Sequence, residues 1–215
     1  MATKTIAPIS IKGISLFLLM YIILTGNYSY AQTGFEYYNV ALVKYNIRDY
    51  KGALDDLARV IEHEPSNPLA FNLRGMVKYS LEDISGAIED YSRAIEIYSS
   101  SEENVKIKIH AQRGNIIESP VKPKPNTDLA VPYYNRALAK NDMENYSGAI
   151  EDYTSALEND PGMVTSYYNR GLARYHSDDL SGACSDWRTA INEGIVQAEE
   201  LIRQYCPEGM PTRLP

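Results

Sequence analysis

The sequence is poor in the residues that most often build catalytic and metal sites. It has 215 residues but only two cysteines and three histidines, and the histidines stand far apart at His63, His110 and His176. No metal-ligand spacing, glycine-rich phosphate loop or nucleophile elbow is present. We therefore expect a protein that is not an enzyme and that needs neither a metal nor a cofactor.

Positive charge is also scarce. The chain carries 21 Lys and Arg against 28 Asp and Glu, which gives a formal net charge of −7. A protein that binds nucleic acid through phosphate contacts needs a basic surface, so we expect no nucleic-acid partner. With 44% apolar and 23% charged residues, the composition is typical of a soluble globular protein with an acidic surface.

Long apolar runs are missing. The longest run, residues 14–24, has 11 residues, whereas a membrane-spanning helix needs about 20. Two lysines precede it, and Ser29 and Ala31 place small residues at the −3 and −1 positions before Gln32. This order predicts a signal peptide over residues 1–31 that is removed on export and leaves no stable membrane anchor. The expected location of the mature protein is periplasmic or secreted.

What the sequence does contain is a repeated hexapeptide. GAIEDY occurs at residues 86–91 and 148–153, and the looser copies GALDDL and GACSDW occur at 52–57 and 182–187. The copies start 34, 62 and 34 residues apart. A fixed period of this length is typical of helical repeats that stack into an array. It divides the chain into units 1 to 4, at residues 34–67, 68–101, 130–163 and 164–194.

Each unit, numbered from 1 at its first residue, keeps one pattern. Position 8 is small and position 20 is always alanine, so two antiparallel helices can approach closely. Positions 4 and 24 are large and fill the space around that contact. Arginine at position 7 recurs with aspartate at position 23, and we expect structural ion pairs, within a unit or between neighbours. The arginines are Arg74, Arg136 and Arg170, and the aspartates are Asp56, Asp90, Asp152 and Asp186.

This pattern resembles the tetratricopeptide repeat family, whose unit is a helix–turn–helix of 34 residues. The segment YYNRALAKNDMENYSGAIEDYTSALENDP, residues 133–161, is close to the family consensus, and so is YYNRGLARYHSDDLSGACSDWRTA, residues 167–190. The resemblance implies an all-α fold, a right-handed α-solenoid of four helix hairpins, and a protein that binds peptides or other proteins.

The C-terminal residues predict a cap for the solenoid. An apolar stripe at helical spacing indicates a capping helix over residues 195–206, which covers the apolar end of unit 4. If this helix runs antiparallel to the second helix of unit 4, Cys184 and Cys206 meet and form a disulfide in an oxidising compartment. The alternative is two buried free thiols. Residues 207–215 are expected to form a flexible tail.

Residues 102–129 interrupt the rhythm between units 2 and 3. Unit 2 has Ser99 where units 1 and 3 have a helix-ending proline, so its second helix is free to continue. A helical face through Val105 and Ile109, as in the first helix of a decayed repeat, competes with a strand-like alternation of Val105, Ile107 and Ile109 with lysines. The helix is favoured, because a lone strand has no sheet to join. This basic, proline-containing insert is either a solvated linker between two pairs of units or an element that contacts a partner.

The family resemblance also implies where a partner binds. The concave groove is lined by positions 5, 6, 9, 12 and 13 of the first helices, where tyrosines supply contact area and asparagines supply hydrogen bonds to a peptide backbone. The alternative role for these tyrosines is packing against the next unit. Position 5 has no lysine and position 9 is apolar, which argues against a clamp for a terminal carboxylate. The implied partner-binding residues are Tyr38, Asn39, Leu42, Tyr45, Asn72, Met76, Tyr79, Tyr134, Asn135, Leu138, Asn141, Tyr168, Asn169, Leu172, Tyr175 and His176.

These observations favour a non-catalytic protein–protein interaction module, an adaptor or assembly factor that binds a protein or extended peptide in its groove. The alternative is a structural scaffold of the cell envelope that self-associates through exposed repeat ends. Gly34 and Phe35 begin unit 1 without a separate cap, so this end is the candidate for self-association.

Overall fold

The computed structural model describes residues 34–113 and 126–206, so the predicted signal peptide and C-terminal tail lie outside the described residues. Every regular element in these two stretches is an α-helix, as the sequence predicts. The helices are one over residues 34–46, α2 (Tyr50–His63), α3 (Pro68–Ser80), α4 (Ile84–Arg113), α5 (Thr127–Asp142), α6 (Tyr146–Asn159), α7 (Val164–His176), α8 (Leu180–Asn192) and α9 (Ala198–Tyr205).

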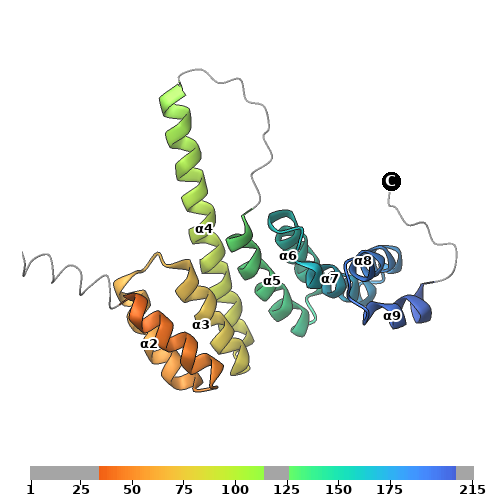
Figure 1. Cartoon of the computed structure of the whole chain (residues 1–215), viewed down its shortest axis with the longest axis horizontal. Coiled ribbons are helices and arrows are strands. Elements are labelled where there is room, and N and C mark those ends of the chain that lie inside the picture. Colours follow the sequence, from red (N-terminus) through yellow and green to blue (C-terminus); the bar gives the residue numbers. More distant parts are fainter. Residues whose placement is uncertain (1–33, 114–125, 207–215) are drawn as a thin grey trace, which may run out of the picture.

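The helices form hairpins that stand side by side in chain order (Figure 1). The helix over residues 34–46 packs with α2, and the next pairs are α3 with α4, α5 with α6 and α7 with α8. The first helix of one hairpin also contacts the first helix of the next, as α3 does with α5 and α5 with α7. The result is an α-solenoid of four hairpins with α9 at its end.

The repeated hexapeptide marks the start of each second helix. The residue at position 15 lies in the turn between the two helices of each hairpin. It takes the left-handed backbone conformation, with φ between 59° and 64°. The Asp or Asn at position 16 then caps the second helix, as Asn145 Oδ1 does by accepting from the Gly148 amide at 3.1 Å. A Cβ on the position-19 glycines would lie 2.1 to 2.9 Å from the capping side chain, so this close approach requires glycine. Position 15 is Arg48, Glu82, Glu144 and Asp178.

The two helices of each hairpin approach as closely as the small residues predict. A Cβ at Gly75 would lie 2.6 Å from the Tyr91 ring, and one at Gly171 would lie 2.5 Å from the indole of Trp187. Alanines at positions 8 and 20 are fully buried in the same way. The large residue at position 24 therefore fills the space that the small residue at position 8 leaves open.

The predicted Arg–Asp pairs form within the hairpins of units 2, 3 and 4. Arg136 Nε and Nη2 lie 2.8 and 2.7 Å from the two oxygens of Asp152, and units 2 and 4 have the same two-pronged pair. A second cation, at position 11, completes each site. In unit 1, Val40 stands at position 7, so Asp56 has one cationic partner within the described ranges. The position-11 cations are Lys44, Lys78, Lys140 and Arg174.

The solenoid is continuous across the insert. Arg136 Nη1 of unit 3 donates to Ser92 Oγ of unit 2 at 2.9 Å, as Arg170 Nη1 of unit 4 donates to Thr154 Oγ1 of unit 3 at 3.0 Å. Both acceptors stand at position 25, so units 2 and 3 stack as direct neighbours. The insert therefore does not interrupt the solenoid between units 2 and 3, because the chain leaves the array at α4 and returns to the place where the next unit stacks.

Part of the insert is an extension of α4. This helix has 30 residues, and its distal part projects out of the row of hairpins (Figure 1). Residues 105–109 are therefore helical and not a strand, but they continue unit 2 and do not begin a decayed repeat. Residues 127–129, which were predicted to belong to the insert, form the first turn of α5. The prolines between positions 120 and 125 lie outside the described residues.

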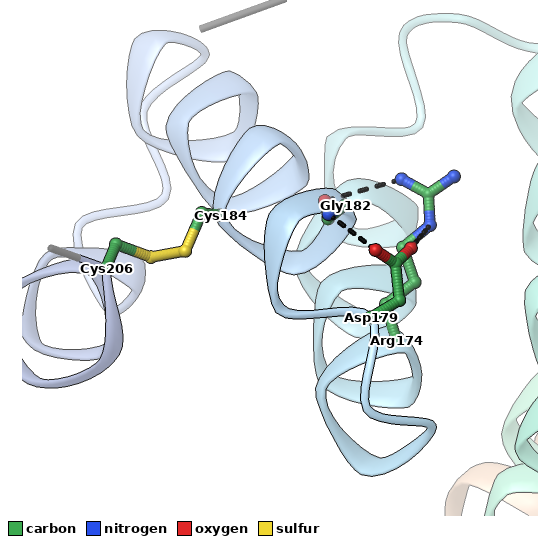
Figure 2. Close-up of a disulfide and its surroundings, with 5 residues drawn as sticks. All are labelled: Arg174, Asp179, Gly182, Cys184 and Cys206. Carbon is green, nitrogen blue, oxygen red and sulfur yellow. Dashed lines mark hydrogen bonds and ion pairs between the residues drawn. A yellow bond between two sulfur atoms is a disulfide. The ribbon is translucent and has the colours of Figure 1, made fainter. Parts of the chain in front are cut away.

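The last hairpin is capped by α9. This helix is shorter than the predicted range of 195–206, because the chain turns at Gly194, where φ is 101°, before α9 begins. Its apolar side chains pack with Trp187 in one core. Cys184 in α8 and Cys206 at the end of α9 form the predicted disulfide, with Cα atoms 5.8 Å apart (Figure 2). The alternative of two free thiols does not hold.

Candidate functional site

Five of the predicted groove residues, from three different hairpins, line one pocket of about 160 Å³. They come from the first helices of units 1, 2 and 3, which lie next to one another because units 2 and 3 stack directly. The pocket therefore depends on the continuity of the solenoid across the insert. The five residues are Tyr45, Met76, Tyr79, Asn135 and Leu138.

Tyr91 also lines this pocket, although it lies on a second helix and was not among the predicted site residues. Its ring reaches the pocket past Gly75 of α3, where a side chain would collide with the ring. Tyr91 is only 2% exposed, and burial raises the pKa of its hydroxyl, so the hydroxyl stays protonated at neutral pH. The signal for it in the sequence was its size at position 24, which indicated core packing alone.

Polar side chains link neighbouring hairpins along the groove. Asn135 Nδ2 donates to Asn72 Oδ1 at 3.1 Å, and Asn169 Nδ2 donates to the Tyr134 hydroxyl at 3.1 Å. Both bonds join position 6 of one unit to position 5 of the unit before it. Each asparagine amide has further donors and acceptors beyond these bonds. The groove therefore presents asparagine amides from units 2, 3 and 4.

The rim of the pocket carries a negative charge. The Tyr79 hydroxyl donates to the carboxylate of Asp142, which stands at position 13 of unit 3. Desolvation by burial, and then this hydrogen bond, raise the pKa of Tyr79 to about 12. Tyr79 is thus a neutral hydroxyl donor under physiological conditions. Beside Asp142, the predicted residue Asn141 has a buried Oδ1 that accepts no hydrogen bond from the described part of the chain.

The predicted residues of unit 4 take part in packing with the cap. The Tyr175 ring lies 4.6 Å from the Tyr205 ring of α9, measured between ring centroids, and Tyr168 and Leu172 pack on the same core. His176 stacks on a tyrosine of unit 3 with ring centroids 4.9 Å apart. Tyr175 therefore packs against the next element, as in the alternative for the tyrosines, and α9 closes the groove at this end.

The predicted residues of unit 1 divide between core and surface. Tyr38 packs on the core that units 1 and 2 share, and burial raises the pKa of its hydroxyl. Asn39 and Leu42 are exposed and do not line the pocket. The structure thus places a compact part of the predicted site at units 1 to 3 and leaves these two side chains outside it.

The family model of the tetratricopeptide repeat matches residues 38–102 and 134–187, more than half of the chain. The chain belongs to the tetratricopeptide repeat family. The matched segments end and resume on either side of the insert, so the family pattern covers the hairpins and leaves the projecting part of α4 out.

Several solved structures have a similar fold. MamA superimposes with a TM-score of 0.58 at 18% identity, over 76% of this chain and 79% of that chain. A tetratricopeptide repeat protein from Parabacteroides merdae gives 0.56 at 19% identity, over 79% and 57%. The first repeat domain of Spaghetti (RPAP3), bound to the HSP90 peptide SRMEEVD, gives 0.51 at 17% identity, over 70% and 94%. At these identities the likeness shows the fold alone. No curated protein matches this chain in sequence.

The position-11 cations of these tetratricopeptide repeats were missed in the sequence, although they recur with the same 34-residue period as the aspartates. Lys78 and Lys140 each lie 2.8 Å from a buried aspartate, so they are engaged within their own hairpins. They are not free to bind a ligand carboxylate. In the two described stretches, no three His, Cys, Asp or Glu side chains gather as metal ligands, and no helix has the length and apolar character to cross a bilayer.

Proposed function

We propose that this tetratricopeptide protein is a non-catalytic adaptor or assembly factor that binds an extended segment of another protein in its groove. The observation that carries the proposal is the pocket that three hairpins build together. Stacked helical repeats characteristically present extended concave surfaces to their partners. A domain of the same fold, the first repeat domain of RPAP3, is bound to a peptide in its solved structure, which supports a peptide as the ligand class.

The lining of the pocket favours one large apolar side chain of the ligand as an anchor. Met76 and Leu138 supply apolar surface, and the tyrosines around them are rigid walls of large contact area. Beside this anchor, the amides of Asn72 and Asn135 form one hydrogen-bonded pair, and the Asn135 amide, which lines the pocket, keeps capacity to hydrogen-bond the peptide backbone. The anchor supplies affinity and the amides fix the direction of the chain.

The charge around the pocket favours a neutral or basic segment over an acidic one. Asp142 places a carboxylate at the rim, while Lys78 and Lys140 are paired with buried aspartates. An acidic segment would therefore meet a like charge, and none of the residues that line the pocket is a cation that could offset it. The proposed ligand differs in this respect from the acidic peptide bound to RPAP3.

We also propose that the protein acts outside the cytoplasm after residues 1–31 are removed. The order of charged, apolar and small residues before Gln32 supports this location. The disulfide between Cys184 and Cys206 is consistent with it, since disulfides persist in oxidising compartments. N-terminal sequencing of the protein recovered from cells should begin at or near Gln32, and an intact Met1 would contradict the proposal.

A peptide selection tests the groove. The chain is used to select binders from a random displayed library, and their affinities are measured by isothermal titration calorimetry. Leu138→Glu should weaken binding at least about tenfold, because an apolar anchor loses about 1.5 to 3 kcal/mol of burial. Asn135→Ala removes an amide without adding a charge and should also weaken binding.

Met143→Glu is the matched control, because Met143 is 53% exposed just after α5 and outside the pocket. It should bind the selected peptides as the original chain does. Circular dichroism shows whether each variant is folded. Unchanged affinity of a folded Leu138→Glu variant would contradict binding in the groove, and a selection dominated by acidic peptides would contradict the proposed charge preference.

A further inference from the structure

The outer face of the first helix is a second surface with a function to explain. Val40, Val43 and Ile47 follow one another at helical spacing and are 46%, 59% and 70% exposed. We propose that this face pairs with the same face of a second copy of the chain, so that two solenoids join through their first helices. None of these residues lines the pocket, so the pairing is independent of peptide binding.

The repeat register identifies this face as one that is normally covered. In units 2 to 4, positions 3 and 10 of the first helix face the preceding unit and are buried. In unit 1 the same positions are Glu36 and Val43, and both are exposed. Unit 1 thus presents the surface that receives a neighbouring hairpin elsewhere in the solenoid. The buried equivalents are Ala70, Val77, Pro132, Ala139, Ser166 and Ala173.

The residue at position 7 also makes this face more apolar than the corresponding face of the other units. Position 7 is arginine in units 2 to 4, and Arg136 and Arg170 each use it to bind the preceding hairpin. In unit 1 this position is Val40, so no cation interrupts the apolar stripe. A contiguous apolar stripe on an otherwise acidic surface marks a contact site.

The described C-terminal end of a second copy is a poor match for this face. At that end α9 occupies the position where a further hairpin would stack. The disulfide between Cys184 and Cys206 holds α9 against α8 (Figure 2). The outward side of α9 carries exposed Glu199, Glu200 and Arg203. Open head-to-tail growth is therefore disfavoured. The pairing that remains between identical copies is a closed one, in which each contributes the same face.

The face is complementary to itself when the two helices run antiparallel. Val40 of one copy then faces Val43 of the other at the centre of the contact. At each end, the exposed Glu36 of one copy lies near the exposed Arg48 of the other, so opposite charges meet. A parallel pairing would instead bring Glu36 beside Glu36 and Arg48 beside Arg48. One helix from each copy makes a small interface, so we expect reversible dimers.

Sedimentation equilibrium measures the pairing. The chain is expressed with its own N-terminal segment, so that any processing takes place, and is studied over roughly 1 to 100 μM. The mean mass should rise from that of one copy toward that of two. Val43→Glu should hold the mass at one copy throughout, because it places two carboxylates in an apolar contact. Val196→Glu, which changes a residue 63% exposed on the turn before α9, is the control and should dimerise like the original chain.

Three outcomes would overturn the pairing. The first is a chain that stays at one copy over the whole range, because the face is then covered by something other than a second copy. The second is a folded Val43→Glu variant that associates like the original. The third is a mass that grows beyond two copies, which indicates open growth. The peptide affinity of Val43→Glu should be unchanged, so a failure of this proposal is distinguishable from a failure of the groove.

Discussion

Replacing one buried aspartate tests the ionic sites that recur through the solenoid. Asp152 is 3% exposed and contacts Arg136 Nε, Arg136 Nη2 and Lys140 Nζ at 2.7 to 2.8 Å. In Asp152→Asn, both cations lose their counter-charge while their side chains are only 18% and 19% exposed. Removing one partner of a buried pair costs about 3 to 5 kcal/mol of unfolding free energy. Because both cations keep some contact with water, we expect about 3 kcal/mol.

Asp56 provides the comparison, because it has fewer partners. Within the described ranges its cationic partner is Lys44, whose side chain is 29% exposed, since Val40 takes the place of the arginine. Asp56→Asn removes a single charged hydrogen bond and should cost about 1.5 kcal/mol, because Lys44 keeps contact with water. The expected difference between the two variants, about 1.5 kcal/mol, is about tenfold in the unfolding equilibrium constant.

Urea unfolding followed by far-ultraviolet circular dichroism measures this difference. With a slope of about 2 kcal/mol per molar urea, the midpoint should fall by about 1.5 M for Asp152→Asn and about 0.75 M for Asp56→Asn. Asp186→Asn controls for position along the solenoid, because Asp186 has two arginine partners but lies in the last hairpin. It should behave like Asp152→Asn. The reasoning is refuted if Asp56→Asn lowers the midpoint as much as the other two.

Three further predictions concern packing, the disulfide and alkaline pH. Gly171→Ala places a Cβ 2.5 Å from Trp187 and should cost about 1 to 3 kcal/mol in urea unfolding; an unchanged midpoint would contradict the close helix approach. Reducing the bond between Cys184 and Cys206, which are 22 residues apart, should cost about 3 kcal/mol in thermal unfolding, whereas Cys206→Ser should not respond to reductant. The pKa of Tyr79 is raised to about 12 in the folded chain, and it is about 10 in the unfolded chain. Between these values the native state holds the proton more tightly, so stability should fall from pH 10 to 12 and fall less steeply in Tyr79→Phe.

The hairpins could be predicted from the sequence because each one is held by contacts inside a single unit. The small residue at position 8 lies 16 residues before the large residue at position 24, and the arginine lies 16 residues before its aspartate, as Arg136 and Asp152 do. The left-handed residue at position 15 could not be predicted, since arginine, glutamate and aspartate occupy it and none favours that conformation as glycine does. Its conformation follows from the capped helix after it.

The stacking of units 2 and 3 could not be predicted from spacing. The spacing of the hexapeptides gives the number of residues between two hairpins. It does not tell whether the extra residues separate the hairpins in space or project away from the stack. The deciding contacts join residues far apart in sequence, such as Arg136 with Ser92 and Asn135 with Asn72. The available signal was a hydroxyl residue at position 25 of the preceding unit, Ser92 before Arg136 and Thr154 before Arg170.

The candidate site could be predicted in outline. The structure brings five predicted residues into one pocket, and their binding of a partner stays a prediction. Tyr91 was missed because it enters the pocket from a second helix, past Gly75. Tyr175 was placed in the groove by its position, but α9 packs on it, and the seating of a cap is not a property that repeats with the units.

The length of α4 connects the pocket to a distant part of the molecule through one continuous helix. Tyr91 on this helix lines the pocket, and the same helix continues 22 residues further to Arg113, which at 1.5 Å per residue is about 33 Å. A continuous helix transmits a displacement of its far end to its base with little loss. A displacement of the distal part of α4 would therefore also move Tyr91, so the projecting part of the helix and one wall of the pocket belong to the same rigid element.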